Sequence, residues 1–96
     1  MLSIMLLPPA DILAAIGQRA KDARLALNLT RKTLAERSGV PEPTIKRFET
    51  TGHIGTAAMV QIAIALDMAM DLEGLFFPKP IRSVKDISKK RQRGVV

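Results

Sequence analysis

The stretch from Thr30 to Glu49 constrains the fold most, because it encodes two short helices joined by a tight turn. Thr30 can cap the first helix, since its hydroxyl can accept a hydrogen bond from a backbone N–H of the first turn. Gly39 follows that helix, and glycine leaves a helix most easily through a left-handed backbone conformation. Pro41 suits the start of a second helix, where its missing N–H costs nothing. We therefore predict one helix between Thr30 and Gly39 and another over about 42–50.

Small and apolar residues inside this stretch fit two helices that cross steeply. Leu34 and Ala35 face inward on the first helix, and Ile45 and Phe48 lie one turn apart on the second. Ala35 is small where the two backbones come close. A small residue, a glycine four positions later, an isoleucine six positions after that and then a phenylalanine form the helix-turn-helix pattern. In that motif the second helix enters the DNA major groove.

On these residues the chain resembles the Cro/lambda-repressor-type (XRE-like) helix-turn-helix family, and the resemblance covers roughly 16–76. It implies an all-α, lambda-repressor-like bundle of about five helices that binds double-stranded DNA. Pro78 and Pro80 mark the end of the domain. We therefore divide the chain into an N-terminal arm (1–10), a helix-turn-helix domain (11–78) and a basic C-terminal tail (79–96).

The resemblance also implies one ion pair. In this family the arginine at the position of Arg24 pairs with the glutamate that closes the recognition helix, here Glu49. Such a pair would fix the angle of the recognition helix rather than add much stability. The alternative is that both are solvated surface charges.

A first helix is predicted before the motif. Asp11 opens it, because a carboxylate is favourable at the positive end of the helix dipole. Apolar residues then recur at three- and four-residue steps, so the helix should run to about Leu27. The inward positions are Ile12, Ala15, Ile16, Ala20, Ala23 and Leu27.

Two further helices follow the motif, one over 56–66 with Thr56 as its cap and a short one that Asp71 starts. In the short helix we expect Leu72, Leu75 and Phe76 to be buried. Gln61 is the single polar residue between Ala57 and Leu66. A helix that is apolar all round must be covered on all sides, so one side should meet another chain, and the related family dimerises through this region. The expected interface residues are Met59, Ile62, Met68, Met70, Phe76 and Phe77.

Five residues of the second motif helix are expected to reach DNA, because they lie at its start or one turn later on the same edge: Glu42, Pro43, Thr44, Lys46 and Arg47. Lys46 and Arg47 can each donate to guanine O6 and N7, and Glu42 can accept from cytosine N4. Thr44 can contact a thymine methyl or a phosphate, whereas Pro43 offers apolar contact alone. The alternative is that Lys46 and Arg47 are only the solvated face of an amphipathic helix.

Contacts to the DNA backbone are expected on either side of these five residues. Arg31 stands at the head of the first motif helix, where the family commonly has glutamine. We expect Arg31 to bind phosphate, but the bracing role of that glutamine is not carried over. Lys32 beside it is a further DNA-binding candidate. Thr50 and Thr51 open a glycine-containing loop that can present backbone N–H groups to phosphate.

Composition excludes other classes of protein. The formal charge of +6 falls entirely in residues 79–96, and the remainder is neutral overall. There is no cysteine and a single histidine, so we expect no disulfide, metal site or cofactor, and no enzyme activity. The apolar start is too short for a signal peptide or a membrane span, and Met5 is an alternative initiator. We expect a cytoplasmic protein that is not bound to a membrane.

The function predicted from these features is transcriptional repression by a homodimer on a palindromic operator, including autoregulation of its own operon. The alternative is the antitoxin of a type II toxin–antitoxin pair, because the compact motif and basic tail resemble HipB-type antitoxins. The partner would then be a toxin protein, a HipA-like kinase. A third reading is an adaptor that kept the fold and binds protein alone.

Overall fold

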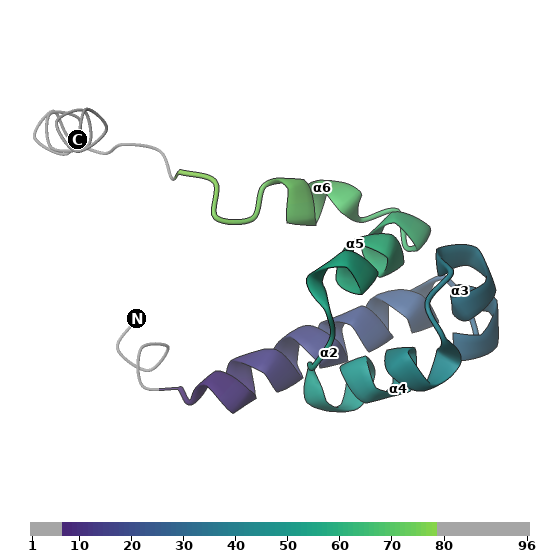
Figure 1. Cartoon of the computed structure of the whole chain (residues 1–96), viewed down its shortest axis with the longest axis horizontal. Coiled ribbons are helices and arrows are strands. Elements are labelled where there is room, and N and C mark those ends of the chain that lie inside the picture. Colours follow the sequence, from purple (N-terminus) through teal and green to yellow (C-terminus); the bar gives the residue numbers. More distant parts are fainter. Residues whose placement is uncertain (1–6, 79–96) are drawn as a thin grey trace, which may run out of the picture.

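The computed structural model describes residues 7–78, and within that range the chain forms five helices and no strand (Figure 1). The expected all-α bundle is thereby confirmed. The helices are α2 (Pro9–Ala26), α3 (Arg31–Ser38), α4 (Glu42–Thr51), α5 (Thr56–Ala65) and α6 (Ala69–Glu73). The proposed basic tail lies outside the described residues.

The motif helices begin and end as their local sequence dictates. Thr30 Oγ1 accepts the Thr33 N–H at 3.0 Å, and Gly39 closes α3 at a φ of 76° with its N–H bonded to the Ala35 carbonyl at 2.9 Å. Gly52 closes α4 in the same left-handed region, at a φ of 84°. The expected cap of α5 is wrong, because Gly55 occupies that position and Thr56 is the first helical residue.

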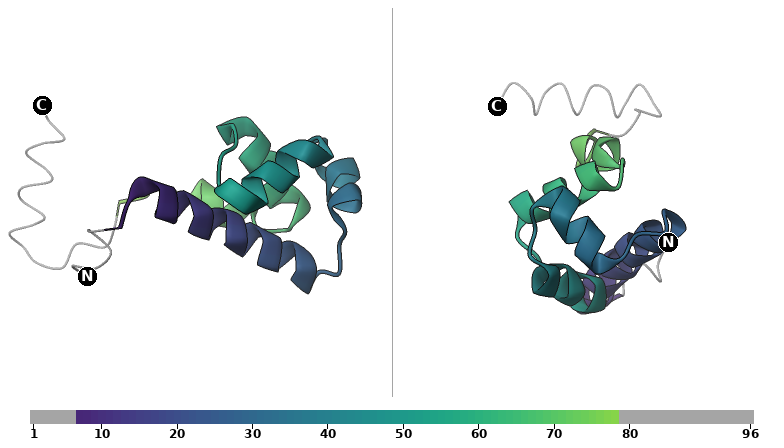
Figure 2. Two further views of the ribbon diagram at one scale, coloured as in Figure 1. Left: turned by 90° about the horizontal axis from the view of Figure 1, so that it is seen from below. Right: turned by 90° about the vertical axis from the view of Figure 1, so that its right-hand side faces the viewer.

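The core lies where α3, α4 and α5 meet, and α2 packs along α4 beside it (Figures 1 and 2). Its fully buried apolar side chains come from these elements and the turn between α3 and α4: Leu34, Val40, Ile45, Phe48, Ile62 and Leu66. Ile16, Ala20 and Ala23 of α2 pack against this cluster. The inward-facing motif residues of the second helix are thus found in the core.

Half of the inward face expected for the first helix is instead exposed. Ile12 and Leu27 are 43% and 49% exposed, and Ala15 is exposed as well. An 18-residue helix such as α2 is about 27 Å long, whereas the 10-residue α4 covers only about 15 Å of it. The ends of α2 therefore extend beyond their partner. The helix also begins at Pro9 rather than Asp11, since proline is favoured at the first helical position.

The predicted burial around α6 is wrong within the single chain. Leu75 is 51% exposed, Phe76 is 96% exposed, and only Leu72 is half-buried. The helix ends at Glu73, so Leu75 and Phe76 lie beyond it in a segment that leads away from the helices (Figure 1). Ile62 is also wrong as an interface residue, because it is 2% exposed and belongs to the core.

Two glycines allow the backbones of α2 and α4 to touch. A Cβ on Gly17 would lie 2.1 Å from the Phe48 carbonyl oxygen, and a Cβ on Gly52 would lie 2.0 Å from that of Leu13. No side chain fits at either distance. The close approach of α2 and α4 therefore requires glycine at both positions.

We expect Gly17→Ala to lower the free energy of unfolding by roughly 3 kcal/mol, because the added methyl group meets backbone that cannot move aside. The matched control is Gly55→Ala, whose Cβ would meet nothing within 4 Å and whose φ of −71° suits any residue. That variant should change the free energy by no more than about 1 kcal/mol. Urea unfolding measures both, and equal effects would contradict the close approach.

Candidate nucleic-acid interface

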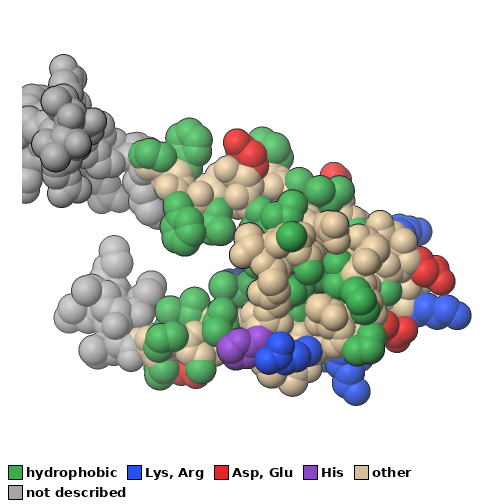
Figure 3. Space-filling view, in the orientation of Figure 1, with side chains coloured by type: hydrophobic (Ala, Val, Ile, Leu, Met, Phe, Trp, Pro, Cys, Tyr) green, Lys and Arg blue, Asp and Glu red, His purple; other side chains and the backbone are tan. Residues whose placement is uncertain are grey.

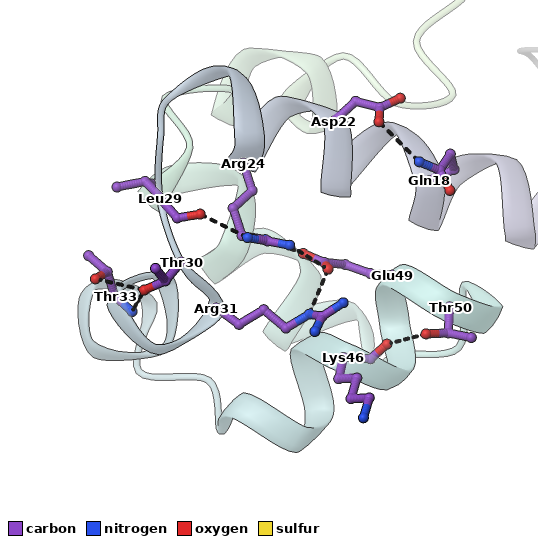
Figure 4. Close-up of polar contacts among 10 residues, drawn as sticks. All are labelled: Gln18, Asp22, Arg24, Leu29, Thr30, Arg31, Thr33, Lys46, Glu49 and Thr50. Carbon is purple, nitrogen blue, oxygen red and sulfur yellow. Dashed lines mark hydrogen bonds and ion pairs between the residues drawn. The ribbon is translucent and has the colours of Figure 1, made fainter.

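A buried carboxylate lies at the end of α4, between two arginines from other helices (Figure 4). Arg24 donates from Nε to Glu49 Oε2 at 2.7 Å and from Nη2 to Oε1 at 3.1 Å. Arg31 donates from Nε to the same Oε1 at 2.9 Å. We call these three residues the Glu49 cluster. Its geometry is a two-pronged contact from Arg24 completed by a single bond from Arg31.

The Glu49 cluster connects three helices and a loop. Arg24 comes from the last turn of α2, Arg31 is the first residue of α3, and Glu49 belongs to α4. Arg24 also donates from Nη1 to the Leu29 carbonyl at 2.8 Å, in the loop that leads into α3. Arg24 and Glu49 are 5% and 4% exposed, so these bonds are shielded from water. The cluster therefore holds α4 at one orientation relative to α2 and α3.

The carboxylate is stabilised in its charged form. Burial raises the pKa of Glu49, but the hydrogen bonds and positive charges of Arg24 and Arg31 outweigh that effect and hold its pKa below the ordinary value. Every buried polar side-chain atom of the described residues has a hydrogen-bond partner. Ionisation of Glu49 is thus part of the folded arrangement.

The opposite edge of α4 faces solvent. Glu42, Pro43, Lys46 and Arg47 are exposed and Thr44 is half-buried, whereas Ile45 and Phe48 point into the core. Four of the five residues expected to read bases are thus exposed on α4, and the fifth, Thr44, is half-buried. Lys and Arg side chains gather over the part of the surface formed by α3 and α4 (Figure 3). The exposed cations among them are Lys32, Arg37, Lys46 and Arg47.

Thr50 and Thr51 lie in the last turn of α4 rather than in a loop. The Thr50 hydroxyl donates to the Lys46 carbonyl and the Thr51 hydroxyl to the Arg47 carbonyl, each at 2.8 Å. The Gly52 N–H bonds to the Phe48 carbonyl at 2.7 Å, and the His53 N–H to the Thr51 hydroxyl at 3.1 Å. The donors expected to meet phosphate at this point are therefore occupied within the chain.

The structure brings Arg24 and Glu49 into direct contact and adds a partner that sequence reasoning missed. Arg31 was expected to bind phosphate, and its Nε also bonds to Glu49 while its side chain stays 31% exposed. A cue was available, because Arg31 directly follows the cap of a helix that crosses α4. Its guanidinium both contacts Glu49 and reaches solvent beside α4.

Residues 7–78 contain no group of three His, Cys, Asp or Glu side chains that could hold a metal ion. No helix in the described part of the chain is long and apolar enough to cross a membrane.

Comparison with models of protein families gives a match over the motif. A family model described as helix-turn-helix matches residues 21–72, which is more than half of the chain and runs from the second half of α2 into α6. The search of curated proteins found no match.

Stability should depend on pH through Glu49. Its folded-state pKa is lowered, so its contribution is complete above the ordinary value near 4.5 and is lost as the pH falls through the folded value. At pH 7 we expect Glu49→Gln to cost about 3–5 kcal/mol, because two buried or half-buried arginines lose their anion. The difference between wild type and variant should shrink toward pH 3 in urea unfolding.

The control for this experiment is Glu36→Gln, since Glu36 is exposed on α3. Its effect should be small at every pH. A wild-type minus Glu49→Gln difference that stays constant from pH 7 to pH 3 would show that the charge on Glu49 is not what stabilises the fold.

Proposed function

The chain belongs to the Cro/lambda-repressor-type helix-turn-helix family of DNA-binding transcription regulators, and from that premise we propose that it is a repressor that acts as a dimer on a palindromic operator. The observation that carries the proposal is the division of α4 into two edges. One edge is buried and held by the Glu49 cluster, and the other presents polar side chains to solvent. Such a helix suits the major groove.

The exposed edge supplies the chemistry for base recognition. Lys46 and Arg47 are donors for guanine O6 and N7, and Glu42 is an acceptor for the cytosine N4 amino group. Thr44 contacts a thymine methyl group or a phosphate, and Pro43 contributes apolar contact. Specific binding in this proposal rests on these five residues.

Contacts to phosphate come from the first turn of α3. Arg31 and Lys32 lie in its first turn, where the helix dipole adds a favourable positive field for anions. The Nε of Arg31 is engaged by Glu49, so the partly exposed guanidinium approaches the DNA already oriented. Thr50 and Thr51, at the other end of α4, are weaker candidates because their hydroxyl hydrogens bond to the chain itself.

Dimerisation is proposed through α5, α6 and the segment after them. Large apolar side chains are exposed there, notably Ile64, Met70, Phe76 and Phe77 at 61%, 76%, 96% and 68%. A two-fold axis would set two copies of α4 one turn of DNA apart, ~34 Å, and would require a palindromic site. Repression then follows because the dimer blocks polymerase at the promoter, and autoregulation requires such a site upstream of its own gene.

The alternative is an antitoxin that also binds a toxin protein such as a HipA-like kinase. It rests on the basic tail, which lies outside the described residues. Nothing in residues 7–78 favours it over a plain repressor. Co-purification with the product of the adjacent gene would support the antitoxin.

The direct test of the proposal is selection of bound sequences from a random duplex library, followed by binding titrations. We expect enrichment of a palindrome. Arg47→Ala should weaken binding to the selected duplex by roughly 1–3 kcal/mol and relax the preference at one position of each half-site, since a bidentate base contact is lost. Arg37→Ala, which removes an exposed charge at the far end of α3, is the control. Equal losses on selected and random DNA would assign Arg47 to phosphate.

The salt dependence of binding tests the phosphate contacts of Arg31 and Lys32, and the stability of the free protein distinguishes the two residues. Arg31→Ala and Lys32→Ala should each weaken binding to the selected duplex and to random duplexes by the same factor. Each should also reduce the slope of log affinity against log salt by about one unit. Of the two variants, Arg31→Ala should also lower the stability of the free protein, because Arg31, unlike Lys32, bonds to Glu49. An unchanged slope in Arg31→Ala would restrict this residue to its contact with Glu49.

A further inference from the structure

An apolar pocket of about 190 Å³ opens beside the core. Its walls come from α2, α4, α5 and α6, and they include Ile16, Phe48, Met59, Ile62, Leu66 and Leu72. Hydrophobic side chains lie on both sides of the gap between α6 and the first turns of α2 (Figure 3). Recognition of DNA leaves this pocket without a role.

The size and lining of the pocket suit an aromatic ring. An apolar cavity of about 150 Å³ is large enough to hold benzene, and this pocket exceeds that volume. Two methionine side chains, Met59 and Met68, belong to its wall, and thioether sulfur makes favourable contacts with aromatic rings. The ring must come from a group that is otherwise exposed.

Phe76 is such a group. Its side chain is 96% exposed, and its φ of 61° lies in the left-handed region, which is unfavourable for a bulky residue. Two other non-glycine residues share this conformation, but they are Asn28 and Asp67, types that tolerate it. An aromatic residue that is both strained and exposed is expected to gain a contact in the assembled state.

The ring and the pocket of one chain are not joined. Leu72 lines the pocket, but after α6 the chain turns at Gly74 and leads away from the helices, carrying Phe76 with it (Figure 1). Each copy therefore has an exposed ring and an open pocket. The ring of one copy can fill the pocket of a second copy, and the reverse contact can form at the same time. A two-fold axis can satisfy both at once.

We propose that Phe76 of each copy inserts its ring into the pocket between α2, α5 and α6 of a second copy. This proposal rests on the dimer of the proposed function and names how that dimer is held. Met59 and Met68 of the pocket wall then contact the inserted ring. The dimer is closed by two identical ring-in-pocket contacts.

Sedimentation equilibrium of the full chain tests the contact. Phe76→Ala should raise the dimer dissociation constant by at least roughly tenfold, as expected when a central aromatic anchor is removed. The matched control is Leu25→Ala, which removes an apolar side chain that is 51% exposed on α2, and it should leave the constant unchanged. Because Phe76 is 96% exposed and contributes almost no buried surface within the chain, its loss should not unfold the protein.

A second variant fills the pocket instead of removing the ring. Ala20 belongs to the pocket wall, and Ala20→Leu should raise the unfolding temperature of the monomer while it weakens the dimer at least roughly tenfold. A mixture of Phe76→Ala and Ala20→Leu chains is the decisive experiment. The mixed dimer keeps one working contact, since the second chain supplies a ring and the first an open pocket. It should therefore be tighter than either homodimer.

Each other outcome overturns the proposal. A Phe76→Ala chain that dimerises like wild type excludes the ring, and a loss seen with Phe77→Ala instead assigns the contact to its neighbour. Failure of the mixed dimer to exceed both homodimers would mean that the two variants act separately. A wild-type chain that binds a selected duplex and stays monomeric at high concentration would remove the dimer but leave DNA recognition intact, which separates this failure from that of the family assignment.

Discussion

The fold depends on one carboxylate that water hardly reaches. Glu49 is 4% exposed and is surrounded by hydrogen bonds from Arg24 and Arg31. A buried charge without a partner is strongly destabilising, so the end of α2, the start of α3 and the end of α4 must be in place together. Ridges of apolar side chains alone tolerate some sliding between helices, whereas directed bonds to two oxygens do not.

Two positional constraints thus act on the same ten-residue helix. Gly17 and Gly52 set how closely α4 approaches α2, and the Glu49 cluster sets its direction. Hydrogen bonds to base edges require donors placed to within fractions of an ångström, so both constraints matter for a helix that reads DNA. The core residues Ile45 and Phe48 supply the burial energy that keeps the helix attached.

The sequence predicts those parts of the fold that depend on residues close together in the chain. Thr30 and Gly39 act on their own turn of chain, and the spacing of Ile45 and Phe48 reports a helix face directly. The predictions that failed depend on how far one helix extends along another, which local sequence does not report. Exposure of Ile12 and Leu27 follows from the unequal lengths of α2 and α4, and exposure of Phe76 from where α6 ends. Likewise, the Arg31 bond to Glu49 spans two helices, and periodicity along one helix carries no information about it.

The two edges of α4 make the protein easy to re-target. Ile45, Phe48 and Glu49 lie on the buried edge of α4, whereas the proposed contacts to DNA come from Glu42, Pro43, Thr44, Lys46 and Arg47. No residue belongs to both sets. Mutations can therefore accumulate on the outward edge without loss of the folded state, and a duplicated gene could acquire a new set of target sites while its scaffold stays the same.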